Sequence, residues 1–485
     1  MPDIPFSSAR QLASMIRTKK IGALELLNLY LQRVERYSDI NAIIFMDVDA
    51  ARKRARQADR ALARGKLWGP LHGVPMTIKE SFDIVGMPTT WGVPRYKENY
   101  PSRNALVVDR FLQAGAVLFG KTNVPMYLAD WQTFNDIYGT TNNPWDRNRV
   151  PGGSSGGSAA ALAAGLTGLE AGSDIGASIR NPAHYCGVYG HKPTYGIISP
   201  FGQTLPGTVG KSDISVVGPL ARSAEDLALA LDVMAGPDDI DGSGWKLSLP
   251  KPKKKELREF KVAIVHDDPE AEVDEEVRKK LRELTIFLKK MKVKVRQDAR
   301  PAIDSREAHR NYIQLLRGAT SGRLTPEDVE KNLAALKSLR ADDESYRAQM
   351  IRAQAMTHKE WLAADNLRHR MRLAWAEFFR DFDLFLCPVA TTTAFEHNQK
   401  GERWERMIPV NGKPQPSTTQ MFWAGYSCNF FLPATVAPIG LSRGELPVGV
   451  QIVGPQYGDH TCIQFARLLE REYHRFIPPT DENNR

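Results

Sequence analysis

The chain is organised around two neighbouring runs, PGGSSGGSAAALAAG at residues 151–165 and AGSDIGASIR at residues 171–180. The first run predicts a glycine- and serine-rich loop leading into an alanine-rich helix, because glycine lets other groups approach the main chain closely. The second run places Ser178 after a short turn whose successive N–H groups can form an anion-binding nest. A serine beside such a nest has what acyl transfer needs, a nucleophile and donors for the oxyanion.

A base for the serine is predicted upstream, in HGVPMTIKES at residues 72–81. The apolar, β-branched part of this run indicates a buried strand that ends at Lys79. Burial disfavours an ammonium group and lowers its pKa, so the neutral amine can accept a proton. Ser154 can then relay a proton between Lys79 and Ser178. Lys121 is the alternative base, but it follows its own strand among polar residues.

These runs resemble the amidase signature family of Ser–Ser–Lys hydrolases, in which the same 24 positions separate the two serines. The resemblance continues in CGVYGHKPTYG at 186–196, SVVGPLAR at 215–222, LPAT at 432–435 and LPVGVQIVG at 446–454. It implies an α/β/α sandwich with a central mixed, twisted β-sheet. Ala177 departs from the pattern, since most members carry glycine there and alanine resists positive φ.

The resemblance also implies a role for each site residue. Lys79 is the general base, Ser154 is a bridging serine held by a cis peptide bond, and Ser178 is the nucleophile that forms the acyl-enzyme. The segment Pro125–Thr133, with Met126 and Tyr127, is expected to line the acyl pocket, although such side chains equally suit a core. The oxyanion hole is expected from the amides of Ile175, Gly176, Ala177 and Ser178.

Other polar residues near the runs are expected to support the site. Asp174 and Arg180 have the spacing of an ion pair that braces the nucleophile turn. Ser155 is expected to matter less to activity than the two other serines. His184 and His191 are interpreted as structural histidines.

Composition narrows the function classes. The net charge of +9 is spread widely, with no aromatic–basic array, so we interpret it as a solvated surface and not as a nucleic-acid interface. The four cysteines form no CxxC pair, which argues against zinc and favours reduced thiols and a cytoplasmic location. No signal peptide and no apolar run long enough for a membrane span is apparent. We expect no metal and no cofactor.

Helix-like and strand-like segments alternate, and no linker or repeat interrupts them, which predicts one domain over residues 1–485. Residues 251–344 are rich in charge, and this family-variable region is expected to shape the substrate entrance. A polar loop at residues 391–415 is placed near the site. The segment Pro125–Phe134 and the pocket candidates are interpreted as apolar and not built for a glutamine side chain, which favours a free-standing hydrolase.

Three other interpretations compete with this one. A phosphate-binding loop would need a GK[ST] ending, which the glycine run lacks. A Ser–His–Asp elbow would need an apolar strand before residues 152–156, where the sequence is loop-like. The third is a glutamine-amidotransferase-type subunit that acts with partner proteins. We favour a free-standing amidase, a monomer or homodimer that hydrolyses linear amides and accepts esters and carbamates, the last being urethanase activity.

Overall fold

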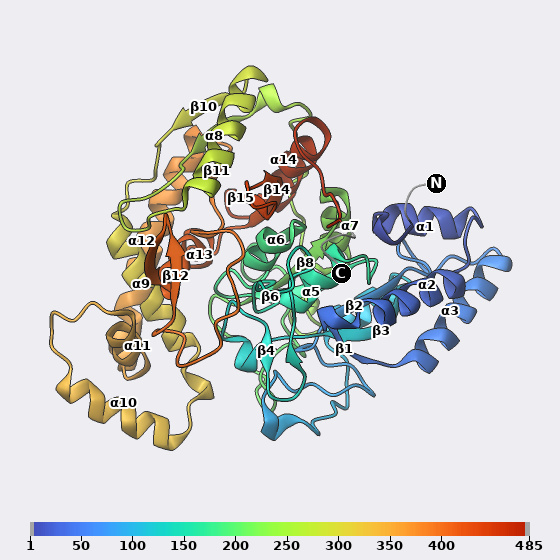
Figure 1. Cartoon of the computed structure of the whole chain (residues 1–485), viewed down its shortest axis with the longest axis horizontal. Helices are drawn as coiled ribbons and strands as arrows, with labels where there is room; N and C mark the ends of the chain where they lie inside the picture. The colour runs from blue at the N-terminus through green and yellow to red at the C-terminus, as the bar shows by residue number, and fades with distance from the viewer. Residues whose placement is uncertain (1–3, 481–485) are drawn as a thin grey trace.

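The computed structural model describes residues 4–480, which form a mixed α/β fold around an eight-stranded sheet (Figure 1). The two pairs at one edge are parallel, and the remaining neighbours are antiparallel. The strand order is β10 (Lys294–Gln297), β9 (Lys261–Ile264), β11 (Leu384–Pro388), β15 (Pro447–Val453), β14 (Ala434–Leu441), β7 (Tyr189–Lys192), β8 (Val216–Ala221) and β6 (Glu170–Asp174).

Helices cover both faces of this sheet, as the α/β/α prediction requires. One face packs against α7 (Ala224–Met234), α8 (Glu275–Lys290) and α14 (Asp459–Glu472). The other face packs against α5 (Gly156–Ala163) and α6 (Arg180–Cys186), which are buried along their whole length. Alanine, glycine and serine make up most of α5, and side chains this small allow the helix to lie close to the strands.

A second sheet of three strands, β1 (Ile43–Met46), β3 (Val117–Thr122) and β2 (Pro75–Lys79), adjoins the first, because β2 lies against β6. The sequence predicted the buried strand that ends at Lys79, and every residue of β2 is buried. The helices of this end of the molecule are α1 (Ala9–Arg17), α2 (Ala23–Arg36), α3 (Val48–Ala63) and α4 (Leu106–Gln113).

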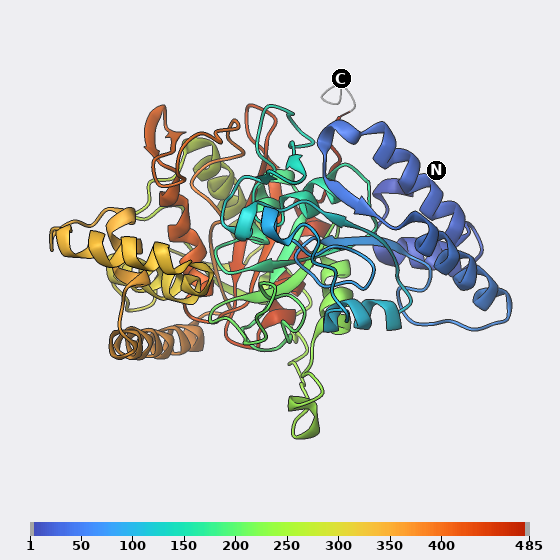
Figure 2. The ribbon, with the colours of Figure 1, turned by 90° about the horizontal axis from the view of Figure 1, so that it is seen from below.

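The opposite end is helical (Figures 1 and 2). It contains α9 (Ser305–Ala319), α10 (Pro326–Ser338), α11 (Tyr346–Gln354), α12 (His358–Asp381) and α13 (Met421–Cys428). The charged region 251–344 therefore supplies β9, β10 and α8 to the main sheet, and α9 and α10 to this helical end. Two short hairpins complete the structure, β4 (Phe134–Asn135) with β5 (Gly139–Thr140), and β12 (Met407–Val410) with β13 (Lys413–Pro416). No helix within residues 4–480 is long and apolar enough to cross a membrane.

Candidate active site

The junction of the two sheets brings Lys79 to the glycine loop. Its Nζ donates to Ser154 Oγ at 2.6 Å and to Ser173 Oγ, on β6, at 3.0 Å. The lysine is fully buried, and this loss of hydration lowers its pKa to about 7, against the opposite pull of Asp174 and Glu80. A large fraction of Lys79 is therefore an uncharged amine at neutral pH, as the sequence led us to expect.

The glycine loop threads closely between other parts of the chain. The Gly153–Ser154 peptide bond is cis, as the family resemblance implied. A Cβ at Gly153 would collide with the carbonyl oxygen of Asp130, and one at Gly156 would collide with the Thr133 hydroxyl. These contacts explain why glycine is required on both sides of Ser154. Ser155 donates its amide to the Ser178 carbonyl at 3.0 Å, so it ties the loop to the nucleophile turn.

Asp174 holds the nucleophile turn in place. Its carboxylate accepts the amides of Ala177 at 2.9 Å and Ile179 at 3.1 Å, and it forms a buried ion pair with Arg180 at 2.9 Å. The pKa of Asp174 is lowered to about 2 because Arg180 and these donors outweigh the effect of burial. Ala177 has φ of +68°, so the alanine occupies the left-handed conformation that the family pattern gives to glycine.

Fewer amides of the turn are free to form the oxyanion hole than the sequence predicted. The amide of Ala177 is engaged by Asp174, whereas those of Ile175, Gly176 and Ser178 have no protein acceptor within residues 4–480. Tyr312 Oη donates to the Ile175 carbonyl at 2.9 Å, and Trp131 Nε1 donates to the Gly176 carbonyl at 2.8 Å. In a trans peptide the N–H points away from the carbonyl, so the Tyr312 bond directs the amide of Gly176 to the opposite side.

Three positioning residues, Ser173, Gln203 and Tyr312, were not predicted from the sequence. Ser173 bonds Lys79, and Gln203 Nε2 in turn donates to Ser173 Oγ at 3.0 Å. Ser173 could have been found from its place directly before Asp174, within the quoted run. Tyr312 was also missed, because it lies in the charged region and carries no local signal of contact with the turn.

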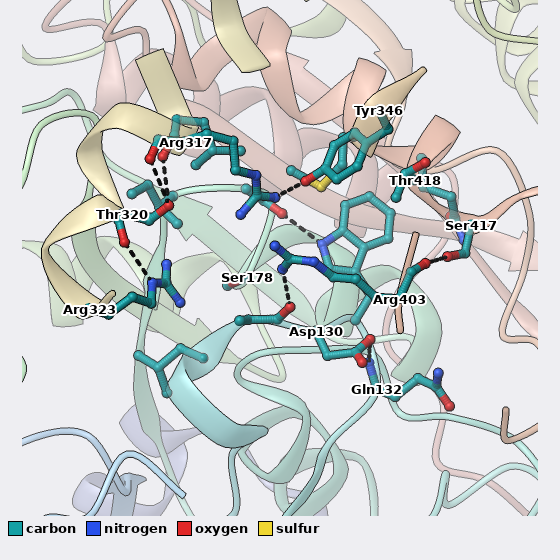
Figure 3. A pocket seen from close by; sticks show the side chains of 18 of the residues that line it. Asp130, Gln132, Ser178, Arg317, Thr320, Arg323, Tyr346, Arg403, Ser417 and Thr418 are labelled. Carbon is teal, nitrogen blue, oxygen red and sulfur yellow. Dashed lines mark hydrogen bonds between the residues drawn. The ribbon is translucent and has the colours of Figure 1, made fainter. Parts of the chain in front are cut away.

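Two cavities meet at Ser178. The first, which we call the arginine cavity, contains the side chains of Arg317, Arg323 and Arg403, turned towards one space (Figure 3). The second, the hydroxyl cavity, is lined by Ser154, Ser173, Ser178, Thr204, Thr208, Ser212, Ser215 and Thr320, with apolar side chains between them. Ser178 and Arg323 line both cavities.

The arginine cavity corrects the expectation of an apolar pocket. That expectation came from the segment around Pro125–Phe134, but the arginines come from α9, from η7 (Ser321–Arg323) and from the 391–415 loop. Tyr127 lines the hydroxyl cavity, whereas Met126 is 48% exposed and lines neither cavity. The role predicted for these two residues stays a prediction.

The alternative catalytic groups are engaged elsewhere. Lys121 Nζ is bonded to the Pro88 carbonyl at 2.6 Å and to Thr89 at 2.9 Å, away from the serines. His184 accepts the Gly449 amide, and burial lowers its pKa to about 4, so it is neutral. His191 is bonded to Thr435 and Asp459. Within residues 4–480, no three His, Cys, Asp or Glu side chains are grouped closely enough to hold a metal ion.

A mixed α/β fold with a buried lysine bonded to a glycine-loop serine is characteristic of one class of protein, the enzymes that act on carbon–nitrogen bonds of amides. The chain belongs to that class as a member of the amidase family, in its amidase signature form, because the family model described as Amidase matches residues 25–463.

Solved structures and curated relatives agree with this membership. A crystal structure described as an amidase has a TM-score of 0.78 and 28% identity, over 96% of this chain and 100% of that chain. The structure of 6-aminohexanoate cyclic dimer hydrolase with its substrate has a TM-score of 0.77 and 26% identity, over 99% of each chain. A glutamyl-tRNA(Gln) amidotransferase subunit of Moorella thermoacetica is 32% identical over 98% of this chain and 99% of its own. A second glutamyl-tRNA(Gln) amidotransferase subunit, from Clostridium acetobutylicum, is 30% identical over 96% of this chain and 98% of its own.

Proposed function

We propose that the chain is an amidase that hydrolyses the C–N bond of linear amides through an acyl-enzyme on Ser178. Neutral Lys79 accepts a proton from Ser154, which accepts one from Ser178 as the Ser178 oxygen attacks the carbonyl carbon. The amides of Gly176 and Ser178 hold the oxyanion. Ser154 then gives a proton to the leaving amine and regains one from the Lys79 ammonium, as the C–N bond breaks. Water cleaves the remaining ester, which releases the acid and restores the Ser178 hydroxyl.

The observation that carries this proposal is the 2.6 Å bond between Lys79 Nζ and Ser154 Oγ. It connects a base whose pKa is lowered to about 7 with a hydroxyl that lines the same cavity as Ser178. A nucleophile activated by a neighbouring base is the general requirement of covalent catalysis by serine.

The decisive test is Ser178→Ala, assayed with a neutral p-nitroanilide. Turnover should fall by about 10⁴-fold or more, because loss of a serine nucleophile removes the covalent path. Ser155→Ala is the matched control: its hydroxyl only faces the Ser173 carbonyl at 3.5 Å, so we expect a loss of about tenfold or less. Mass spectrometry of the trapped acyl-enzyme should locate the adduct on Ser178. Normal turnover by a folded Ser178→Ala protein would refute the proposal.

The same attack applies to esters and to carbamates, so both are proposed as further substrates and urethanase activity is part of the proposal. We also propose that the chain acts as a monomer or homodimer in the cytoplasm. A panel of amides, esters and carbamates with matched acyl groups, read beside Ser178→Ala, defines the range.

A second candidate is an amidotransferase-type subunit that releases ammonia from glutamine for a partner protein. Two observations favour it. The two curated relatives named above are amidotransferase subunits, and each matches this chain over nearly its whole length. The arginine cavity is also polar enough to hold glutamine, whose α-carbon carries charged groups. Glutamine hydrolysis that exceeds simple amide hydrolysis and rises when a co-purifying partner is added would establish this candidate. Full activity of the isolated chain on simple amides would favour the free-standing amidase.

A further inference from the structure

The arginine cavity holds more positive charge than its surroundings neutralise. Asp130 is the one carboxylate among its lining residues, and this side chain is paired with Arg406. Within residues 4–480, Arg317, Arg323 and Arg403 form no salt bridge with any carboxylate. Three guanidinium groups therefore face one space without a counter-ion from the part of the chain that the structure describes.

The bonds of these arginines leave donors free. Arg317 is only 5% exposed; one terminal nitrogen donates to the Tyr346 hydroxyl, and Nε has no partner within the described residues. Arg323 donates to the carbonyls of Thr320 at 3.0 Å and Tyr127 at 2.9 Å, and Arg403 donates to the Ala129 carbonyl. Each guanidinium has five donors, so the cavity retains several for a ligand.

Repulsion among the arginine side chains also favours an anion in the arginine cavity. Burial, together with the neighbouring arginines, lowers the pKa of Arg317 to about 10 and that of Arg323 to about 9. Both remain cationic at neutral pH, and a buried charge without a partner is costly. An anion in the cavity would relieve this cost, and the planar guanidinium matches a carboxylate in geometry.

The position of Ser154 decides which half of a substrate enters the arginine cavity. Ser154 lines the hydroxyl cavity and not the arginine cavity. The leaving amine must receive its proton from Ser154, so it lies on the hydroxyl side. The acyl group then extends from Ser178 into the arginine cavity.

We propose that the preferred substrates are amides whose acyl part ends in a carboxylate, bound by Arg317, Arg323 and Arg403. This inference rests on the proposed function for the direction of the substrate. The substrate class is thus the monoamides of dicarboxylic acids, with the amine in the hydroxyl cavity.

The test compares the mono-p-nitroanilides of succinic, glutaric and adipic acid with p-nitroanilides of neutral acyl chains of the same length. At least one acid should show a kcat/KM at least tenfold above that of its neutral counterpart. Arg317→Met and Arg403→Met should each lower this ratio at least fivefold. Arg310→Met is the matched control, because Arg310 lies on the same helix, α9, but is 54% exposed and paired with Glu344, so its ratio should match wild type. A ratio of one or less at all three lengths would overturn the inference.

Binding separates this inference from the proposed function. Calorimetry on Ser178→Ala protein should give at least tenfold tighter binding for glutarate than for glutaramide, which is neutral, whether or not any anilide is hydrolysed. Equal binding of the two would overturn the inference even if Ser178-dependent hydrolysis of neutral anilides stands. If Arg317→Met does not fold, Arg403→Met carries the comparison, since Arg403 is only half-buried in a loop.

Discussion

Lys79 can act as a base because of where its amine is placed: none of the carboxylates that the structure describes forms an ion pair with it. Its two bonds go to neutral hydroxyls, on Ser154 and Ser173, which stabilise a charge less than an ion pair would. Asp174, the nearest acid of the turn, is committed to Arg180. Burial therefore lowers the pKa of Lys79, and the neighbouring carboxylates Asp174 and Glu80 raise it too little to cancel that effect.

This arrangement predicts the pH dependence of activity. The ordinary pKa of lysine is 10.5, and burial lowers that of Lys79 to about 7, so the active neutral form grows as pH rises through 7. For a neutral anilide, kcat/KM should increase about tenfold per pH unit below 6.5 and level off above 8. The measurement is a pH–rate profile from pH 5.5 to 9.

Lys79→Arg supplies the control for that profile, because arginine keeps a cation at this position over the whole range. The variant should have little activity and no rise near pH 7. A wild-type profile that is flat, or that falls with rising pH over this range, would contradict the assignment of Lys79 as the base.

Among single residues, the sequence predicts the site residues that lie within or next to a recognisable motif. It misses those that the fold brings to the site from distant parts of the chain. Ser154 and Ser178 are in a glycine-rich run of characteristic spacing, and Lys79 ends a strand of recognisable composition. Arg317 and Arg403 lie in charged segments whose composition is the same for a solvated face and for a binding site. Only the tertiary fold distinguishes the two.

Among the elements, α9 links the charged region to the nucleophile turn. Tyr312 on this helix bonds the Ile175 carbonyl, and Arg317, little more than one turn further along, lines the arginine cavity. Strand β2 and helix α5 are predictable because their patterns of buried residues are local. The contact made by α9 is not, since it joins segments 137 positions apart.

Removing the Tyr312 hydroxyl tests this link. Tyr312→Phe keeps the ring in its buried cluster with Ile214 and Leu316 but leaves the Ile175 carbonyl without its donor. One lost hydrogen bond of about 1 kcal/mol predicts a fall in kcat of about fivefold, with KM nearly unchanged, because the turn rather than the binding cavity is disturbed. Steady-state kinetics on a neutral anilide measure the effect.

Tyr426→Phe is the matched control, because its hydroxyl bonds Asp268 and takes no part in the turn. This variant should keep the wild-type kcat. A Tyr312→Phe protein with unchanged kcat, or one in which only KM rises, would show that α9 does not position the turn.

On the scale of the whole molecule, the site lies where two sheets join. Glu170, on β6, accepts a hydrogen bond from the Thr77 hydroxyl on β2, and its second carboxyl oxygen has no partner within the described residues. Burial raises the pKa of this carboxyl to about 8, so it is protonated at neutral pH. A protonated, neutral Glu170 thus connects the two sheets through Thr77. On β2, Thr77 lies two positions before Lys79, whose amine bonds Ser154.

This protonation predicts how stability responds to pH. Glu170 has an ordinary pKa of 4.5 when unfolded, so between pH 4.5 and about 8 the folded protein binds the extra proton, and its contribution to stability falls as pH rises. Glu170→Gln removes the titration while keeping the shape. From pH 5 to 7.5 the free energy of unfolding of wild type, relative to that of the variant, should drop by about 2–3 kcal/mol. Urea unfolding at the two pH values measures it, and Lys79, present in both proteins, cancels in the difference. If the two proteins show the same pH dependence, Glu170 is already ionised in the fold and the joint is not a neutral one.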